Sequence, residues 1–472
     1  MTAQDLDFDA CYRAVSARDA RFDGRFYTAV KTTRIYCRPI CPARTPAARN
    51  VRFYRHAASA EAAGFRPCKR CRPELSPGDP GWDVRGDFVG RALRLIDDGA
   101  ADDTGVAGLA RRLHITERHL HRLFVAELGV GPLAVARTKR LLLAKQLLTE
   151  TGLPVTDVAF AAGFGSVRQF NATMRETYGF TPSELRATAR GAAAAPAETA
   201  SLRLRLHRRE PYDVAGVFAF LAARAIPGLE QAGPASYSRV VPGGTLTLTP
   251  QPGHIALEVS IDDTRQLARL VGRCRRLLDL DSDPAAIAET LGQTSLAPLV
   301  AARPGLRVPG AFDGFELAVR AVVGQQVSVA GARTLLGRIV ARAGSPVGPP
   351  EEGARLFPTP AELAAADLDG LGLTTRRIAT LHALAERTGS GEIDLDGGQE
   401  PAEAVARLLE VPGIGPWTAG YIALRALRDP DAWPEGDLVL RKRMAALDIP
   451  DEHTERWRPW RAYAALYLWS AS

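Results

Sequence analysis

The sequence predicts a multidomain, mainly α-helical protein. It comprises a small α+β domain, a tandem helix-turn-helix block, and an α+β domain with a large helical body. Three observations predict this order. Four of the six cysteines lie between residues 37 and 71, two helix-turn-helix patterns lie within residues 85–190, and helical patterns dominate after residue 263. The length of 472 residues suits roughly three domains of about 150 residues each.

The net charge of +7 is concentrated in the first 190 residues. Residues 1–75 carry 15 Lys and Arg against 7 Asp and Glu, and residues 85–190 carry 15 against 11. From residue 191 onward the balance is slightly acidic, with 30 against 33. A basic front half favours a polyanionic partner, although many solvated surfaces are basic as well.

No apolar run of the sequence is long enough to span a membrane, and the N-terminus lacks a charged-then-apolar signal pattern. We therefore expect a cytoplasmic protein without a membrane partner. That compartment is reducing, so clustered cysteines are expected to bind metal rather than to form disulfides.

Residues 1–78 form the first predicted domain, which is organised around two close cysteine pairs. Cys37 and Cys41 form one pair, Cys68 and Cys71 form the other, and 26 residues separate them. This spacing is typical of four thiolates around one tetrahedral Zn²⁺. The ion would stabilise a segment whose aromatic core is thin. From spacing alone, Zn²⁺ can be a structural staple, or one of the thiolates can be chemically used.

Residues 85–190 form the second predicted domain, with two helix-turn-helix units joined by a Leu-rich helix over residues 138–149. In each unit a short helix ends in a turn, and a Thr or Ser side chain caps the helix that follows. The first helices and the caps are residues 106–113 with Thr116, and residues 154–163 with Ser166. A helical protein-interaction bundle would show the same buried periodicity.

The polar faces of the two capped helices favour DNA as the partner. Their side chains are of the kinds that read base edges or hold phosphates in a major groove. They are Arg118, His119 and Arg122 in the first unit, and Arg168, Gln169 and Asn171 in the second.

Two linkers and two further segments complete the predicted organisation. Turn residues predict a linker from Ser76 to Gly81, and the alanine-rich residues 191–200 predict a flexible one. In residues 201–310, alternating apolar residues predict a small antiparallel sheet before the pattern turns helical. Residues 311–472 are predicted to form the helical body.

The helical body contains a Pro-Gly-Ile-Gly turn between two helices. Gly413 and Gly415 let the backbone turn sharply and approach a phosphate, and the helix start beyond them offers free N–H groups. Such a helix-hairpin-helix binds the DNA backbone without reading its sequence. A turn of this kind can also be a plain connector between helices. Trp417 and, twenty positions later, Asp437 make the pattern more specific.

These segments resemble three known families. Residues 30–44 and 63–71 resemble the N-terminal domain of adaptive-response Ada proteins, and residues 158–183 resemble the DNA-binding domain of AraC-type activators. Residues 202–472 resemble 3-methyladenine DNA glycosylase II (AlkA), of the helix-hairpin-helix superfamily.

The resemblance to Ada implies that Cys37 is a methyl acceptor, which takes the group from a DNA methylphosphotriester while the other three cysteines complete the zinc site. It places Thr33 and Arg44 at the DNA backbone. Methylation removes one negative charge from the cluster, and this strengthens binding to DNA. The AraC-type block would then bind its promoter more tightly and activate repair genes, with RNA polymerase as a partner.

The resemblance to AlkA implies that Asp437 is the catalytic aspartate. A carboxylate stabilises the positive charge that develops on the deoxyribose and helps to position water. Trp417, Tyr421 and Trp469 fall on aromatic positions around the base pocket, where electron-rich rings favour a cationic alkylated base. The same three could be plain core aromatics. Gln326 falls where the resemblance implies a leucine that wedges into the duplex.

Missing residues exclude two kinds of related enzyme. Lyase-type members of the superfamily carry a lysine where this chain has Trp417. Iron–sulfur members carry four cysteines near the C-terminus, whereas this chain has none after Cys274. The Pro-Cys-His-Arg acceptor for O6-methylguanine is also absent.

The expected protein is thus a bifunctional regulator and repair enzyme, with Zn²⁺ as its cofactor and double-stranded DNA as its partner. It would act as a monomer, release bases such as 3-methyladenine by hydrolysis, and leave the strand uncut. The alternative is a transcriptional regulator whose glycosylase-like domain binds DNA but is catalytically inactive.

Overall fold

The computed structural model describes residues 6–79, 88–190, 201–348 and 353–471. The chain divides into two compact units, Met1–Arg209 with Asp263–Gly272, and Glu210–Asp262 with Arg273–Ser472. The predicted linker over residues 191–200 and the last two residues of the predicted Ser76–Gly81 linker lie outside the described residues. Within the described parts helices predominate, as the sequence predicts, and none of them is long and apolar enough to cross a membrane.

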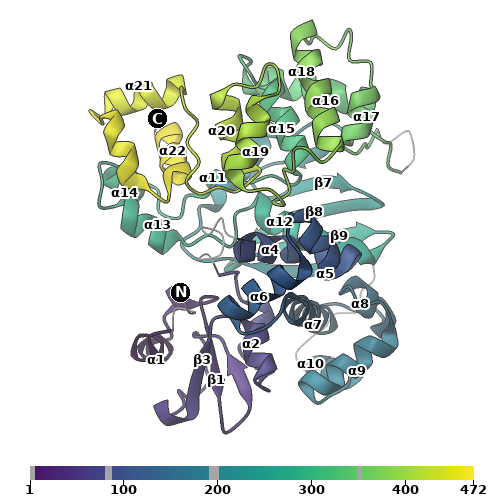
Figure 1. The fold of residues 1–472 in the computed structure, drawn as a ribbon, viewed down its shortest axis with the longest axis vertical. Coiled ribbons are helices and arrows are strands. Elements are labelled where there is room, and N and C mark those ends of the chain that lie inside the picture. The colour runs from purple at the N-terminus through teal and green to yellow at the C-terminus, as the bar shows by residue number, and fades with distance from the viewer. Residues whose placement is uncertain (1–5, 80–87, 191–200, 349–352, 472) are drawn as a thin grey trace. The chain divides into compact units, whose positions relative to one another are not determined.

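A small mixed sheet forms the front of the first unit, drawn in purple in Figure 1. Its elements are α1 (Phe8–Ala17), β1 (Tyr27–Val30), β2 (Ile35–Cys37), β3 (Val51–Tyr54), α2 (Ala57–Ala62) and β4 (Arg66–Pro67). The strand order is β3-β1-β2-β4, in which β2 and β4 are parallel. Because β2 ends at Cys37 and β4 leads directly into Cys68, this pairing brings the two cysteine pairs to the same end of the sheet.

Helices follow in the first unit. They are α4 (Phe88–Asp97), α5 (Ala100–Arg112), α6 (Glu117–Leu128), α7 (Pro132–Glu150), α8 (Val155–Ala161), α9 (Val167–Tyr178) and α10 (Pro182–Arg190), and β5 (Leu202–His207) comes after them. Both predicted caps are confirmed, because Thr116 Oγ1 accepts from His119 N and Ser166 Oγ accepts from Gln169 N, each at 3.2 Å. The helix predicted over residues 138–149 begins six residues earlier, at Pro132, since a proline in the first turn needs no N–H partner.

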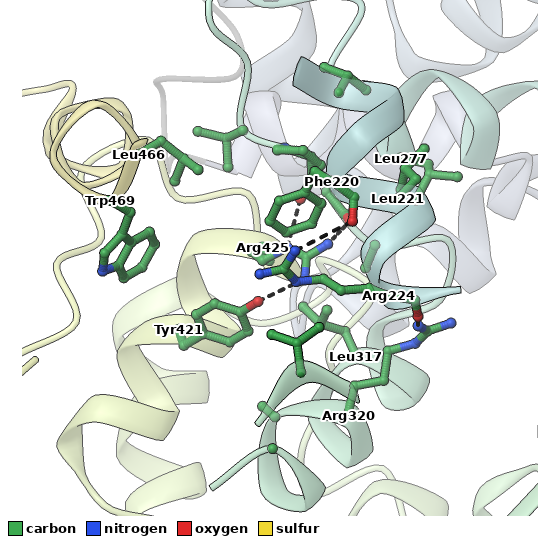
Figure 2. A pocket seen from close by; sticks show the side chains of 18 of the residues that line it. Phe220, Leu221, Arg224, Leu277, Leu317, Arg320, Tyr421, Arg425, Leu466 and Trp469 are labelled. Carbon is green, nitrogen blue, oxygen red and sulfur yellow. Dashed lines mark hydrogen bonds between the residues drawn. The ribbon is translucent and has the colours of Figure 1, made fainter. Parts of the chain in front are cut away.

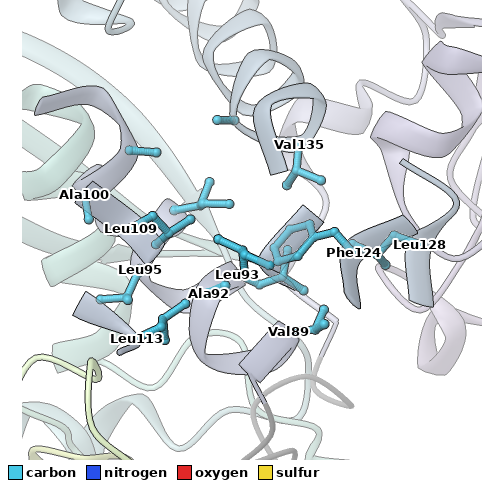
Figure 3. Packing of buried hydrophobic residues seen from close by; sticks show 14 of the residues in the cluster. Val89, Ala92, Leu93, Leu95, Ala100, Leu109, Leu113, Phe124, Leu128 and Val135 are labelled. Atoms are coloured by element: carbon cyan, nitrogen blue, oxygen red, sulfur yellow. The ribbon is translucent and has the colours of Figure 1, made fainter. Parts of the chain in front are cut away.

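Apolar side chains from α4, α5, α6 and α7 hold the first helix-turn-helix unit together (Figure 3). Leu109 and Phe124 are completely buried, and Leu95 and Val135 pack into the same cluster. Burying a side chain of this size contributes roughly 1.5–3 kcal/mol. The cluster therefore fixes α6, whose opposite face carries the predicted DNA contacts.

One face of α7 packs on the cysteine-rich front of the same unit through buried polar groups. Lys145 is 2% exposed; its Nζ lies 2.6 Å from Glu74 Oε2 and donates to the carbonyl of Cys68 at 3.2 Å. Nearby, Arg72 Nη2 donates to Thr149 Oγ1 at 2.9 Å. A lysine within a Leu-rich helix gives no sign of this role, because its partners lie more than seventy residues away in the chain.

Glu61 forms a second polar link between the front sheet and α7. Tyr36 Oη donates to its Oε1 at 3.0 Å, and Thr138 Oγ1 donates to its Oε2 at 2.6 Å. Burial raises the pKa of Glu61 to about 7, against the opposing effect of these two hydroxyls and of Arg137 and Lys145. Folding therefore moves the titration of this carboxyl toward neutral pH.

We expect Glu61→Gln to flatten the pH dependence of stability of the first unit. Between pH 4.5 and about 7 the native state retains a proton that the unfolded chain has released, so the free energy of unfolding falls as pH rises, by about 3 kcal/mol. The glutamine variant removes this titration. Denaturant unfolding of the full chain at several pH values, followed by zinc release, measures the slope. Glu117→Gln, at an exposed site, is the control and should keep it, whereas an unchanged slope in Glu61→Gln would contradict the prediction.

The second unit begins with a helix and an antiparallel meander. These elements are α11 (Val214–Arg224), β6 (Glu230–Ala232), β7 (Tyr237–Val241), β8 (Gly244–Gln251) and β9 (His254–Ile261). Each strand pairs with the next along the chain. The small antiparallel sheet that the alternating apolar residues predict within residues 201–310 is therefore present.

The helical body makes up the rest of the second unit. Its helices are α12 (Leu267–Leu277, which begins in the first unit), α13 (Pro284–Leu291), α14 (Ala297–Ala302), α15 (Gly314–Val323), α16 (Val329–Ala343), α17 (Pro360–Ala365), α18 (Thr375–Gly389), α19 (Pro401–Leu409), α20 (Pro416–Arg425), α21 (Leu438–Ala446) and α22 (Arg461–Ser470). Figure 1 shows α19 and α20 side by side, with α15 next to them. The Pro-Gly-Ile-Gly turn connects α19 to α20, so the predicted helix-hairpin-helix is present.

Candidate functional site

The four clustered cysteines meet at one point in the first unit. One ligand atom from each of Cys37, Cys41, Cys68 and Cys71 lies within 4.8 Å of all the others. Backbone N–H groups of Arg38 and Arg70 donate to the sulfurs of Cys71 and Cys68, each at 3.3 Å. Donors of this kind stabilise thiolates, and four sulfurs at this separation fit a closed tetrahedral Zn²⁺ site.

The four cysteines differ in their access to solvent. Cys68 and Cys71 are buried, while Cys37 and Cys41 are partly exposed. A hydrogen bond to sulfur lowers its nucleophilicity. Both buried sulfurs accept one, and the backbone N–H of Ala43 donates to Cys41. Geometry therefore favours Cys37 as a reactive thiolate, which is also the residue that the Ada resemblance implies.

The predicted DNA contacts of the first unit lie on its surface, with one exception. Exposed side chains are Thr33, Arg44, Arg118, Arg122, Arg168, Gln169 and Asn171. His119 is instead half-buried: its ring packs edge-on against Phe88, with centroids 6.2 Å apart, and its Nδ1 lies 2.9 Å from Arg122 Nη2. His119 is thus better placed to orient Arg122 than to reach a base.

The second unit contains a cavity of about 700 Å³. Trp417, Tyr421, Trp469 and Asp437, which lie on three different helices or at their starts, all line it. The structure therefore brings together four residues that the sequence analysis placed in one base pocket. Gln326 does not line the cavity but is exposed beside it, between Gly324 and Val327, which do.

Asp437 is fixed by three hydrogen bonds. Its Oδ1 caps α21 by accepting from the backbone N–H groups of Val439 and Leu440, each at 2.8 Å. Its Oδ2 accepts from Trp417 Nε1 at 2.7 Å. The carboxylate is only 8% exposed, and it lies at the positive end of a helix. These donors hold a negative charge at the cavity wall in one orientation.

Three aromatic rings form the wall beside Asp437. Trp417 and Tyr421 are stacked, with centroids 5.6 Å apart and an angle of 13° between the rings. Tyr421 and Trp469 are tilted by 58°, with centroids 6.3 Å apart. Figure 2 shows Trp469, which lies on α22, next to Tyr421. The rings therefore face a space large enough for a purine instead of filling a core.

The cavity also has a cationic floor that the sequence analysis missed. Arg425 Nη1 donates to Tyr421 Oη at 2.9 Å, and the guanidiniums of Arg425 and Arg224 lie 4.7 and 3.8 Å from the centroid of Phe220 (Figure 2). Burial acts against ionisation of Tyr421, yet Arg425 and Arg224 together hold its pKa below the ordinary value. Phe220 and Arg224 are four residues apart on α11, and this spacing places both on one helix face.

We expect Trp417→Phe to lower the rate of base release without weakening DNA binding. The variant keeps an aromatic ring beside Tyr421 but removes the donor to Asp437 Oδ2. A hydrogen bond to a charged group is worth about 1.5–3 kcal/mol, so the single-turnover rate should fall about 10- to 100-fold. Trp433→Phe, which removes an indole away from the cavity lining, is the control. An unchanged rate in Trp417→Phe would show that the ring alone matters.

The hairpin turn, residues 412–415, has the geometry of a backbone-binding loop. Gly413 has φ +94°, and a Cβ at this position would lie 2.2 Å from Thr380 Oγ1, so only glycine fits. In the part of the chain that the structure describes, no heavy atom outside Gly415 and its two chain neighbours lies within 4 Å of a Cβ built on Gly415. Gly415 therefore leaves open space at the start of α20, where N–H groups can meet a phosphate.

Family models match three parts of the chain. They are the metal binding domain of Ada over residues 10–74, a helix-turn-helix domain over residues 109–188, and the AlkA N-terminal domain over residues 203–313. The first match, together with the four adjacent sulfurs, assigns the cysteine cluster to Zn²⁺.

Three relatives cover the same parts. The chain is 48% identical to a probable bifunctional transcriptional activator/DNA repair enzyme AlkA of Mycobacterium tuberculosis (strain ATCC 25618 / H37Rv), over 98% of this chain and 96% of that protein. It is 34% identical to DNA-3-methyladenine glycosylase 2 of Escherichia coli (strain K12), over 56% of this chain and 95% of that protein. It is 38% identical to the bifunctional transcriptional activator/DNA repair enzyme Ada of Escherichia coli (strain K12), over 38% of this chain and 49% of that protein.

The similarity to the Mycobacterium protein extends over nearly the whole of both chains. This chain therefore belongs to the family of bifunctional transcriptional activators and DNA repair enzymes of the AlkA type.

Proposed function

We propose that this chain senses alkylated DNA, activates transcription of repair genes, and excises alkylated bases such as 3-methyladenine. The observation that carries the proposal is Asp437, whose carboxylate is held by three donors in an aromatic-walled cavity. A catalytically inactive DNA-binding domain would not need to hold a charge in this way. The proposed domains are residues 1–78, 85–190 and 201–472, the last with a division near residue 310.

In the proposed excision step, the bond between the base and C1′ of the deoxyribose breaks, and the base leaves with the bonding electrons. A cationic alkylated base becomes neutral as it departs, which makes it a good leaving group. Positive charge develops on the sugar, where the Asp437 carboxylate stabilises it. Water then adds to C1′ and releases its proton to the solvent, and the phosphodiester backbone stays intact. Trp417 and Tyr421 hold the flipped base by stacking.

In the proposed sensing step, Cys37 Sγ attacks the methyl carbon of a methylphosphotriester. An S–C bond forms, the C–O bond breaks, and the electron pair stays on the phosphate oxygen. When bound, Zn²⁺ keeps the cysteines as thiolates, which are the nucleophilic form. Cys37 becomes a neutral thioether, so the cluster loses one negative charge and is repelled less by DNA.

The first unit would then bind its promoter more tightly through Thr33, Arg44, Arg118, Arg122, Arg168 and Gln169. We propose RNA polymerase as the further partner, and a monomer in the cytoplasm, associated with the nucleoid, as the active form. Release of free 3-methyladenine from methylated duplex DNA tests the repair activity. If the wild type releases no more base than Asp437→Asn, the alternative of a regulator with an inactive rear domain is correct.

A further inference from the structure

The segment 324–328, here called the wedge loop, holds Gln326 in an unusual conformation. Gln326 has φ +54°, in the left-handed region that non-glycine residues adopt at a cost of about 1–2 kcal/mol. Its side chain is exposed beside the cavity rather than packed. A strained residue persists only where the surrounding structure determines its backbone, so something must hold the wedge loop in place.

The side chain of Gln325 supplies that restraint. Its Nε2 donates to the carbonyl of Gly413 at 3.0 Å and to Thr418 Oγ1 at 2.9 Å. Gly413 lies in the hairpin turn, and Thr418 lies one turn into α20 and is 3% exposed. A single amide group therefore joins the wedge loop to the loop that is proposed to bind the DNA backbone.

Two side chains of α18 brace the same junction. Arg377 Nη2 donates to the carbonyl of Gln325 at 2.6 Å. Thr380 Oγ1 donates to the carbonyl of Pro412 at 2.8 Å and is itself buried. The wedge loop and the hairpin turn are thus each bonded to α18 as well as to each other, and this arrangement resists independent movement of either loop.

We propose that Gln325 is a positioning residue that couples the hairpin's hold on the DNA backbone to the insertion of Gln326 into the duplex. The inference rests on the proposed base excision. When the hairpin turn meets a phosphate, the Gln325 amide fixes where Gln326 stands relative to that phosphate. A preset wedge avoids the entropy cost of ordering a loop at the moment of base flipping. Gln325 therefore lowers the barrier for a paired lesion and has little to do for a base that is already unpaired.

The test compares one lesion in two duplexes, with the damaged base either paired or opposite an abasic site. Gln325→Leu keeps the volume and removes both donors. The kcat/KM of the full-chain variant should fall about 10-fold more for the paired lesion than for the unpaired one, since two hydrogen bonds are lost. Gln399→Leu is the matched control, because this buried amide also bridges backbone groups but lies away from the cavity lining. It should leave the ratio between the two substrates unchanged.

A second pair of variants separates positioning from folding. Thr418→Ala removes one acceptor of the Gln325 amide. It should lower the ratio of kcat/KM for the paired lesion to kcat/KM for the unpaired lesion, but by less than Gln325→Leu does. Thr418→Ser keeps the hydroxyl and should restore the wild-type ratio. Equal losses on paired and unpaired substrates, in either Gln325→Leu or Thr418→Ala, would overturn the proposal. Fluorescence of 2-aminopurine paired with thymine reports flipping out of the duplex without any cleavage, and Gln325→Leu should reduce the increase that the wild type produces. It therefore tests the coupling even if the wild type releases no base, an outcome that would count against the proposed excision alone.

Discussion

Replacing Asp437 with asparagine is expected to lower the rate of 3-methyladenine release about 100- to 1000-fold, the scale of loss when one preorganised electrostatic group is removed from an active site. Asparagine can still cap α21 through its side-chain oxygen, so the helix should stay in place. It cannot supply the negative charge that stabilises the sugar cation. Its amide nitrogen would also face the Trp417 N–H, where two donors meet. Single-turnover release of free base from methylated duplex measures the effect.

Asp283→Asn provides a matched control for the Asp437 variant. Asp283 caps α13 in the same way, since its Oδ1 accepts from the N–H groups of Ala285 and Ala286 at 3.0 and 3.2 Å. It is buried to a similar extent and lies outside the cavity lining. Its variant should release base at the wild-type rate. If both variants lose activity equally, the effect comes from capping and Asp437 has no chemical role; if Asp437→Asn keeps more than a tenth of the rate, the assignment is wrong.

The second large effect concerns Cys37. After exposure to DNA that carries methylphosphotriesters, mass spectrometry of wild-type peptides should place one methyl group on Cys37, and Cys37→Ser should take up none. Serine has no thiolate, and its hydroxyl is a far weaker nucleophile at neutral pH. The wild-type protein should also bind promoter DNA more tightly after methylation. This gain in affinity should depend less on salt concentration than the affinity itself does. Cys37→Ser should show no such gain.

Cys11→Ser is the control for the Cys37 variant. Burial, and to a smaller extent Asp7, raise the pKa of Cys11 to about 11, so this thiol stays protonated and unreactive. The variant should accept methyl groups as the wild type does. A methyl group found on Cys41 of the wild type would refute the assignment, because Cys41 is the other partly exposed sulfur of the cluster.

The features that could be predicted from sequence are those fixed by neighbours in the chain. Thr116 and Ser166 cap helices through N–H groups three residues away, and Gly413 is required by the turn in which it lies. The cysteine spacing likewise predicts a zinc site without reference to distant residues. Composition and local pattern are sufficient in such cases because the physical cause is local.

The features that escaped prediction depend on distant contacts. Arg425 donates to Pro309 and Gly310, and its guanidinium lies over Phe220, more than two hundred residues away in the chain. No periodicity marks an arginine as the floor of a cavity when its partners come from α11 and from the segment before α15. Gln325 was not predicted for the same reason, because its partners Gly413 and Thr418 lie about ninety residues away in the chain. The resemblance to AlkA pointed to Asp437 but not to the groups that hold the surrounding loops.

The buried pair of Lys145 and Glu74 bears on how such proteins arise by gene rearrangement. A helix-turn-helix block joined to a different front, with no carboxylate at the place of Glu74, would bury Lys145 without a counter-ion, and breaking a buried pair in this way costs about 3–5 kcal/mol. That loss is a large part of the stability of an ordinary domain. We therefore expect recombination to have moved these two modules together as one piece, so that related proteins differ in the domain that is joined behind them.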